Sequence, residues 1–243
     1  MGYLYNLILY QPLLNTLIFF YNTIAFRDLG LAIIFLTILI RLILFPLFHK
    51  SARHQMIMQQ LQPKLKKIQE DHKDNKEKQA QAMMDLYKEH EINPLSGFLL
   101  LAIQLPILIA LYQIFIKSIK PDFMTGLYYF IQAPASLNAT FFGLINLNQR
   151  SILMVCLAGA AQYLQAKLSI PEVEVGHSLT QAEKMTRQMV FLGPVLTIAI
   201  FYNLPAAISL YWLVASLFSV FQQIIINKQI SHGKVGNINK ENN

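Results

Sequence analysis

Long apolar runs alternate with polar stretches along this chain. Runs of about 20 residues, the length that crosses a bilayer as a helix, occupy 29–50, 93–116 and 151–170. The last apolar block, 189–227, is too long for one span and suits two, with the turn signal "NLP" at 203–205 between them. The pattern predicts an all-α polytopic membrane protein with five core transmembrane helices, over 29–50, 93–116, 151–170, 189–203 and 204–227.

The N-terminal segment, 1–28, is apolar but interrupted by amides. From Gln11 onward its apolar residues recur with helical spacing, which predicts an amphipathic helix lying at the membrane interface. The predicted apolar face comprises Leu13, Leu14, Leu17, Ile18, Tyr21 and Ile24. Asn15 and Asn22 fall off this face. A first membrane-spanning helix is the alternative for this segment.

The segment 51–92 is rich in both signs of charge and contains no glycine. Apolar residues recur three or four positions apart on both sides of the polar break "DHKDN", which predicts two amphipathic helices folded into a hairpin. Pro63 is expected in the first turn of its helix. The predicted seams are Met58, Leu61, Leu65 and Ile68 in one helix and Ala80, Met83 and Tyr87 in the other. A docking surface and a merely solvated helical pair are both open for this hairpin.

Lysine and arginine are unevenly shared between the polar segments. They gather in the hairpin, in the loop 171–188 and in the tail 228–243, whereas the loop 117–150 holds few. Positive residues are retained on the cytoplasmic side of membrane proteins. The hairpin and the C-terminal tail are therefore expected in the cytoplasm, and the loop 117–150 outside.

Composition narrows the possible function. The chain of 243 residues is 54% hydrophobic and 14% charged, against about 25% charged residues in soluble domains. Its single cysteine, Cys156, excludes an internal disulfide and a zinc site built on several cysteines. The N-terminus does not read as a secretory signal. No nucleophile, phosphate-loop or metal-ligand spacing occurs, so we expect no catalytic residue, metal, cofactor or direct DNA binding.

One arginine lies where lipid is expected. Arg41 is near the middle of the run 29–50, and no predicted span holds an Asp or Glu to pair with it. A mid-membrane arginine costs roughly 2.5–3.5 kcal/mol on insertion scales. We therefore expect a water-accessible, positive groove open to the cytoplasm, with snorkelling of Arg41 to the headgroups as the alternative. The candidate groove residues are Arg41, Thr37, Gln104, Gln162, Gln165, Ser209, Trp212 and Ser216.

Four stretches carry a resemblance to a known family: "IRLILFPLF", "LYKEHEINPL", "IQLPILIALY" and "LPAAISLYW". In this order they resemble the YidC family of membrane protein insertases, in its short form without a large periplasmic domain, which has mitochondrial and chloroplast relatives. The resemblance implies a hydrophilic groove around one arginine, matched by Arg41 and lined by Gln104, Gln165 and Trp212. It also implies a mobile cytoplasmic hairpin. The hairpin candidates are Pro63, Lys64, Lys66, Lys67 and Tyr87.

The resemblance also implies a function and a location. The chain would insert and fold newly made membrane proteins in a bacterial plasma membrane, receiving polar segments in the groove and releasing apolar segments into lipid. The implied partners are nascent membrane proteins and the lipid bilayer, with the Sec translocon, the signal recognition particle receptor and the translating ribosome as further candidates. A small polytopic transporter or channel is the alternative, and a lipid-handling scaffold and an intramembrane enzyme are weaker rivals.

Overall fold

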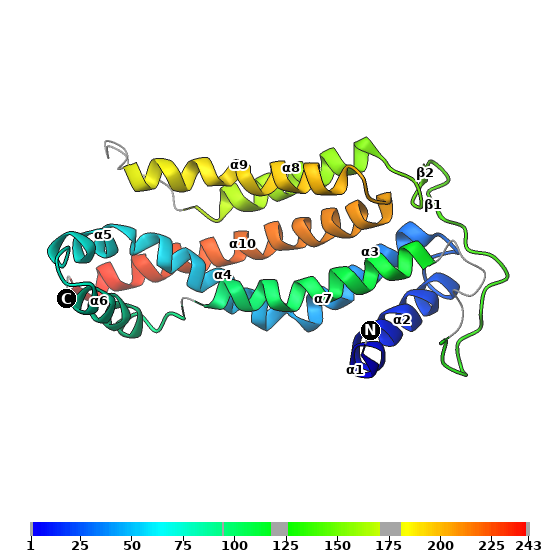
Figure 1. The fold of residues 1–243 in the computed structure, drawn as a ribbon, viewed down its shortest axis with the longest axis horizontal. Coiled ribbons are helices and arrows are strands. Elements are labelled where there is room, and N and C mark those ends of the chain that lie inside the picture. Colours follow the sequence, from blue (N-terminus) through cyan, green and yellow to red (C-terminus); the bar gives the residue numbers. More distant parts are fainter. Residues whose placement is uncertain (1, 94, 118–125, 171–180, 242–243) are drawn as a thin grey trace.

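Helices running side by side build most of the molecule (Figure 1). The computed structural model describes residues 2–93, 95–117, 126–170 and 181–241. The central helix, α10, contacts α8 on one side and α3 and α7 on the other, while α9 packs on α8. The bounds are α3 (Leu29–Ile43), α7 (Ser96–Lys117), α8 (Ile152–Leu168), α9 (Gln181–Phe201) and α10 (Ala206–Glu241).

Two helical stretches are long and apolar enough to cross a membrane, Phe98–Lys117 in α7 and Ala206–Gln229 in α10. Helix α3 and the following α4 (Phe45–Gln60) would together make a third, but they are bent by 68°. Helix α8 and the stretch Val190–Phe201 of α9 are apolar but shorter. The all-α polytopic membrane fold is thus confirmed, whereas five complete spans stay a prediction.

The first predicted span, 29–50, is not one straight helix. Asp28 begins α3 by accepting a hydrogen bond from the Leu31 backbone at 2.9 Å. The helix ends at Ile43, and Pro46 occupies the first turn of α4. Proline has no N–H to donate to the carbonyl four residues back, and its ring crowds that carbonyl. The apolar run therefore continues in sequence but changes direction at Leu44.

The predicted hairpin forms at one end of the bundle (Figure 1). Helix α5 (Gln62–Asp71) begins with Pro63 in its first turn, as expected. Helix α6 (Lys76–Glu89) follows the break "DHKDN", and Asn75 caps it by accepting a hydrogen bond from the Lys78 backbone at 3.0 Å. The buried seam is Leu61, Leu65, Leu86 and Ile92, with Met58, Ile68, Met83 and Tyr87 partly buried. The seam prediction was wrong for Ala80, which is exposed because α6 presents Met83 and Leu86 inward.

The N-terminal segment consists of α1 (Tyr3–Tyr5), a π-helical turn (Asn6–Tyr10) and α2 (Gln11–Asn22). The predicted apolar face of α2 is buried except for Ile24, which lies beyond the end of the helix and is exposed. Asn15, expected off this face, is buried and holds the loop after α7: its side chain donates to the Gly126 carbonyl at 3.1 Å and accepts from the Tyr128 backbone at 2.7 Å. Whether α2 lies on the membrane or spans it stays a prediction.

The loop between α7 and α8 carries a short antiparallel ribbon, β1 (Thr140–Phe141) with β2 (Ile145–Asn146), at the end of the bundle opposite the hairpin (Figure 1). The backbone N–H groups of Ala206 and Ala207 donate to Gln149 and Leu147, which ties this loop to the start of α10. Around this end lies the main apolar core. It includes Leu14, Leu29, Ile33, Leu111, Phe115, Leu147, Met154 and Tyr211.

The last two helices differ from their predicted bounds. The turn at 203–205 is present, but α9 already begins at Gln181 rather than 189, and α10 continues to Glu241 beyond the predicted end at 227. Turns of mainly polar sequence thus extend both helices past their apolar stretches. Parts of the predicted loops, 118–125 and 171–180, lie outside the described residues.

Candidate functional site: a polar cavity around Arg41

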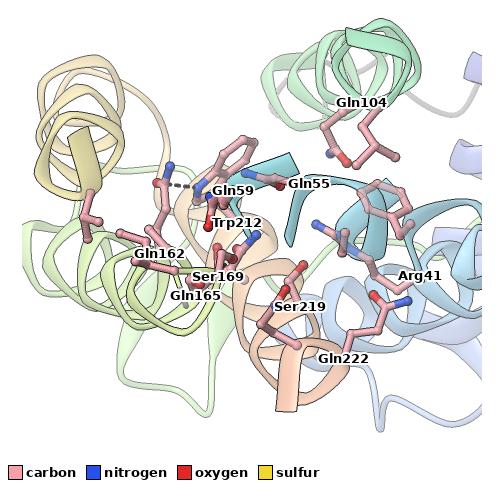
Figure 2. A pocket seen from close by; sticks show the side chains of 18 residues that line it. Arg41, Gln55, Gln59, Gln104, Gln162, Gln165, Ser169, Trp212, Ser219 and Gln222 are labelled. Atoms are coloured by element: carbon pink, nitrogen blue, oxygen red, sulfur yellow. Dashed lines mark hydrogen bonds between the residues drawn. The ribbon is translucent and has the colours of Figure 1, made fainter. Parts of the chain in front are cut away.

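A cavity of about 510 Å³ lies between α3, α4, α7, α8, α9 and α10 (Figure 2). It is bordered by the first half of α7, the last turns of α8 and the middle of α10. These are the parts of the helices that point toward the hairpin, whereas the opposite end of the bundle is filled by the apolar core. The cavity is therefore confined to one half of the bundle.

Arg41 is the only charged side chain among the described residues that line this cavity. Its guanidinium carbon lies 4.4 Å from the centre of the Phe48 ring. The residue is 8% exposed, and its buried Nη1 has no hydrogen-bond partner within the described part of the chain. Leaving a buried charged donor unpaired is costly, so this nitrogen is disposed to bind an oxygen atom that enters the cavity.

Most of the predicted groove residues meet here. Arg41 lies on one side of the cavity, with Gln162 and Gln165 on the other side (Figure 2). Gln104, Trp212 and Ser216 also line it.

Thr37 and Ser209 do not line this cavity, although both were grouped with its residues. Both side chains are completely buried. The Thr37 hydroxyl donates to the Ile33 carbonyl at 2.6 Å, and the Ser209 hydroxyl has no partner among the described residues. Each lies about one turn closer to the apolar core than Arg41 and Trp212, which removes it from the polar half of the bundle.

Several lining residues were missed by sequence reasoning. Gln55 and Gln59 come from α4, which the sequence assigned to the hairpin, and the bend at Leu44 turns this helix over the cavity. A usable signal existed on α10, because the polar stripe through Trp212 and Ser216 continues at helical spacing. Ser219, which the 3,4,3 spacing of Ser209, Trp212, Ser216 and Ser219 puts on this stripe, lines the cavity, and the polar lining residues that were missed are Gln55, Gln59, Ser169, Gln222 and Gln223.

Side-chain amides join the helices around the cavity. Gln162 on α8 accepts hydrogen bonds from the indole N–H of Trp212 on α10, at 3.0 Å, and from the Thr197 hydroxyl on α9. Gln104 on α7 donates to the hydroxyl of Tyr211 on α10. On the α4 side, Gln222 donates to the Phe45 carbonyl at 3.1 Å. These bonds connect the helices that form the walls of the cavity, and none of them uses Nη1 of Arg41.

The hairpin candidates lie apart from the cavity. Pro63, Lys64, Lys66 and Lys67 are exposed on α5, and Tyr87 is partly buried against the hairpin seam. Lys66 pairs with Glu70 at 3.9 Å. The described residues contain no group of three or more His, Cys, Asp or Glu that could hold a metal ion.

The fold and the site define a class of protein. It is a helical membrane protein with a polar cavity around one arginine, and the cavity occupies half of the length of the helical bundle. Residues 19–233 match the family described as 60Kd inner membrane protein. The chain therefore belongs to this family.

Named relatives agree with the predicted resemblance to the YidC family, which is confirmed. "Membrane protein insertase YidC" of Pelobacter propionicus is 32% identical over 226 residues, which cover 91% of this chain and 39% of the relative. The protein of the same name from Francisella tularensis subsp. novicida is 36% identical over 209 residues, which cover 84% of this chain and 34% of the relative. A crystal structure described as an active YidC insertase matches with a TM-score of 0.56 at 26% identity, over 87% of this chain and 45% of the solved one. The chain thus spans less than half the length of each relative.

Proposed function

We propose that this chain is a membrane protein insertase, which receives polar segments of a substrate in the cavity around Arg41 and releases apolar segments into lipid. The observation that carries the proposal is the buried guanidinium of Arg41, whose Nη1 has no hydrogen-bond partner among the described residues, in a polar cavity that ends halfway along the bundle. The names of the relatives support the same role.

The physical task of an insertase is to move polar groups across hydrocarbon. Each unsatisfied backbone group in the bilayer core costs several kcal/mol. A water-filled cavity through half of the bundle would shorten, by about half, the distance that a polar segment must travel through hydrocarbon. Arg41 adds a positive charge in a region of low dielectric, where its attraction for an acidic substrate residue is stronger than in water. The cavity would thus lower the barrier for a polar terminus or loop.

The outer faces of α8 and α10 offer a route into lipid. Both helices carry exposed apolar side chains next to the cavity, among them Leu164 on α8 and Leu217 and Phe221 on α10. An apolar substrate segment could leave the cavity along these faces. Its burial in lipid supplies the driving force, at roughly 25 cal/mol per Å² of apolar surface, so no nucleotide is needed at this site.

A transporter or channel is favoured less, because it needs a polar path from end to end. Beyond the cavity, the core of the described bundle is mainly apolar and buried. Leu36, Leu111, Ile208 and Tyr211 stand across the path toward the ribbon. An opening on one side suits delivery of a substrate sideways into lipid better than passage through the bundle.

The charge distribution supports an orientation with the hairpin and the C-terminal helix end in the cytoplasm. The cavity would then face the compartment in which membrane proteins are synthesised. Nascent membrane proteins are accordingly the proposed substrates. The Sec translocon, the signal recognition particle receptor and the translating ribosome are candidate partners, to be tested by direct binding to the reconstituted protein.

The decisive experiment is insertion of a small single-span substrate into proteoliposomes that hold only this protein. Arg41→Ala should lower protease-protected substrate about tenfold, since a hydrogen bond to a charged group contributes roughly 1.5–3 kcal/mol. Arg41→Lys should retain part of the activity. The matched control is Arg150→Ala, an exposed arginine of the loop before α8. Equal insertion by wild type and Arg41→Ala, with both proteins folded, would refute the proposed role of the cavity.

A further inference from the structure

A second cavity, of about 660 Å³, lies beside the bend between α3 and α4. Helix α4 lines it with His49, Lys50, Arg53 and His54, and the segment after α6 lines it with His90 and Glu91. Glu91 is the only carboxylate among these residues. We call it the basic cavity. Its polar lining carries more positive than negative charge at neutral pH.

Hydrogen bonds next to the basic cavity connect α4 to the segment that runs from α6 into α7. The Ser51 hydroxyl on α4 donates to the Ser96 carbonyl on α7 at 2.9 Å. The Asn93 backbone donates to Nδ1 of His54 at 3.4 Å. These contacts join residues far apart in sequence, so the cavity is a built feature of the fold.

Two imidazole nitrogens in the basic cavity lack a partner. Nδ1 of His49 and Nε2 of His90 are buried and make no hydrogen bond to any described residue. The pKa of His54 is lowered, first by burial and then by the positive charges of Lys50 and Arg53. A site with unpaired nitrogens and an excess of positive charge is suited to an anion.

The surroundings indicate which kind of anion. Leu42 and Ile43, immediately before the bend, are 56% and 66% exposed. Leu95 and Phe98 follow Glu91 closely in the chain and are also exposed. Exposed apolar residues at the ends of membrane-spanning helices suit contact with acyl chains, and in the chain such residues stand just before and just after the segments that line the basic cavity. A ligand with a charged head and apolar tails matches this arrangement.

We propose that the basic cavity binds the phosphate of an anionic phospholipid headgroup, with the acyl chains against the apolar residues before the bend. An acidic peptide would satisfy the charges but would leave the adjoining apolar surface without a matching group. The inference goes beyond the proposed insertase function and does not depend on it.

The test is lipid binding by the purified full chain in detergent, measured by native mass spectrometry. The probes are phosphatidylglycerol, phosphatidylcholine and inorganic phosphate. Lys50→Gln/Arg53→Gln should raise the Kd for phosphatidylglycerol about tenfold, since each basic residue near an anionic headgroup contributes measurably to binding. Lys64→Gln/Lys67→Gln removes the same charge from exposed sites on α5, outside the basic cavity, and should leave the Kd unchanged.

Three outcomes would overturn the proposal. These are equal binding of both lipids by wild type, equal loss in the two double variants, and displacement of the lipid by inorganic phosphate at similar concentration. The last outcome would indicate a site for a free anion.

A second measurement does not depend on counting lipids. A bound phosphate stabilises the imidazolium, so phosphatidylglycerol should raise the pKa of His54, followed by NMR of labelled histidine, relative to phosphatidylcholine. The shift should vanish in Lys50→Gln/Arg53→Gln. An unchanged pKa of His54 in the wild type would contradict binding in the basic cavity. Neither measurement uses insertion, so this inference and the insertase proposal can fail separately.

Discussion

The ring of Phe141 in β1 lies directly against Gly30 in α3. A methyl group on Gly30 would stand 2.1 Å from Cδ2 and 2.8 Å from Cβ of Phe141, far inside van der Waals contact. Asp28, the cap of α3, also accepts a hydrogen bond from the Phe142 backbone at 2.7 Å. The ribbon therefore packs closely on the first turn of α3. Gly30 has no side chain to keep Phe141 away, and the Asp28 carboxylate accepts hydrogen bonds from both α3 and the ribbon.

Gly30→Ala is expected to lower the free energy of unfolding by about 1–3 kcal/mol, the usual cost of overpacking. The new methyl group is fixed to the backbone, so Phe141 must move instead. Denaturant titration in detergent measures the effect. In a Phe141→Ala background the same substitution should cost much less, and an equal cost in both backgrounds would show that this contact is not responsible.

Gln162→Leu should destabilise the packing of α8, α9 and α10. The substitution leaves the Trp212 indole and the Thr197 hydroxyl without their acceptor, at a cost of about 1–3 kcal/mol. Thermal unfolding by circular dichroism would measure it. Gln165→Leu is the matched control, because Gln165 lines the same cavity and its side chain makes no hydrogen bond to a described residue. If both variants unfold alike, the network around Gln162 contributes nothing particular.

Asn15→Leu should release the loop after α7 from α2. Asn15 is 1% exposed. Its side-chain amide donates a hydrogen bond to the Gly126 carbonyl and accepts one from the Tyr128 backbone N–H. Hydrogen exchange at the Tyr128 amide should accelerate about tenfold or more, since an unmade buried bond costs 1–3 kcal/mol. Asn22→Leu removes one exposed bond, to the Gln132 carbonyl, and should leave Tyr128 protected. Unchanged exchange in Asn15→Leu would contradict this account.

Leu86→Ala should loosen the hairpin without disturbing the bundle. Leu86 is buried in a small cluster with Leu61, Leu65 and Ile92. Removing a buried leucine side chain costs at least about 2 kcal/mol, a large share of what so small a cluster can supply. Exchange should quicken in α5 and α6 while α10 keeps its protection. Met84→Ala, at an exposed position of the same helix, is the control. A similar increase in hydrogen exchange in this variant would argue against a packed seam.

Regular features of the chain were readable from sequence. The break "DHKDN", the first-turn position of Pro63 and the turn at 203–205 all occur as predicted, because each depends on local chemistry. The apolar face of α2 and most of the hairpin seam also follow from helical spacing. Arg41 lines the cavity, and so do five of the six expected cavity residues that come from α7, α8 and α10, since polar groups inside apolar runs are few. The exception on these helices is Ser209, which is completely buried about one turn closer to the apolar core.

Other features needed tertiary context. The bend at Leu44 follows a proline, but its direction, which brings Gln55 and Gln59 over the cavity, depends on the packing of α4 against α7 and α10. Asn15 lies off the apolar face by spacing, yet it is buried because a distant loop supplies its partners. Depth along a helix likewise decides that Thr37 lies in the core while Arg41 lines the cavity.

Trp212 is the only tryptophan in the chain, and it lines the cavity with its ring edge-on to Phe201 at 5.3 Å. Tryptophan fluorescence, excited selectively over that of the tyrosines, therefore originates from one point, on the wall of the proposed substrate site. A quencher carried by a substrate segment would dim this emission on entry, and one carried on acyl chains would report lipid at the same place. Occupancy of the cavity can thus be followed optically in the unlabelled wild-type protein, without any substitution in the cavity.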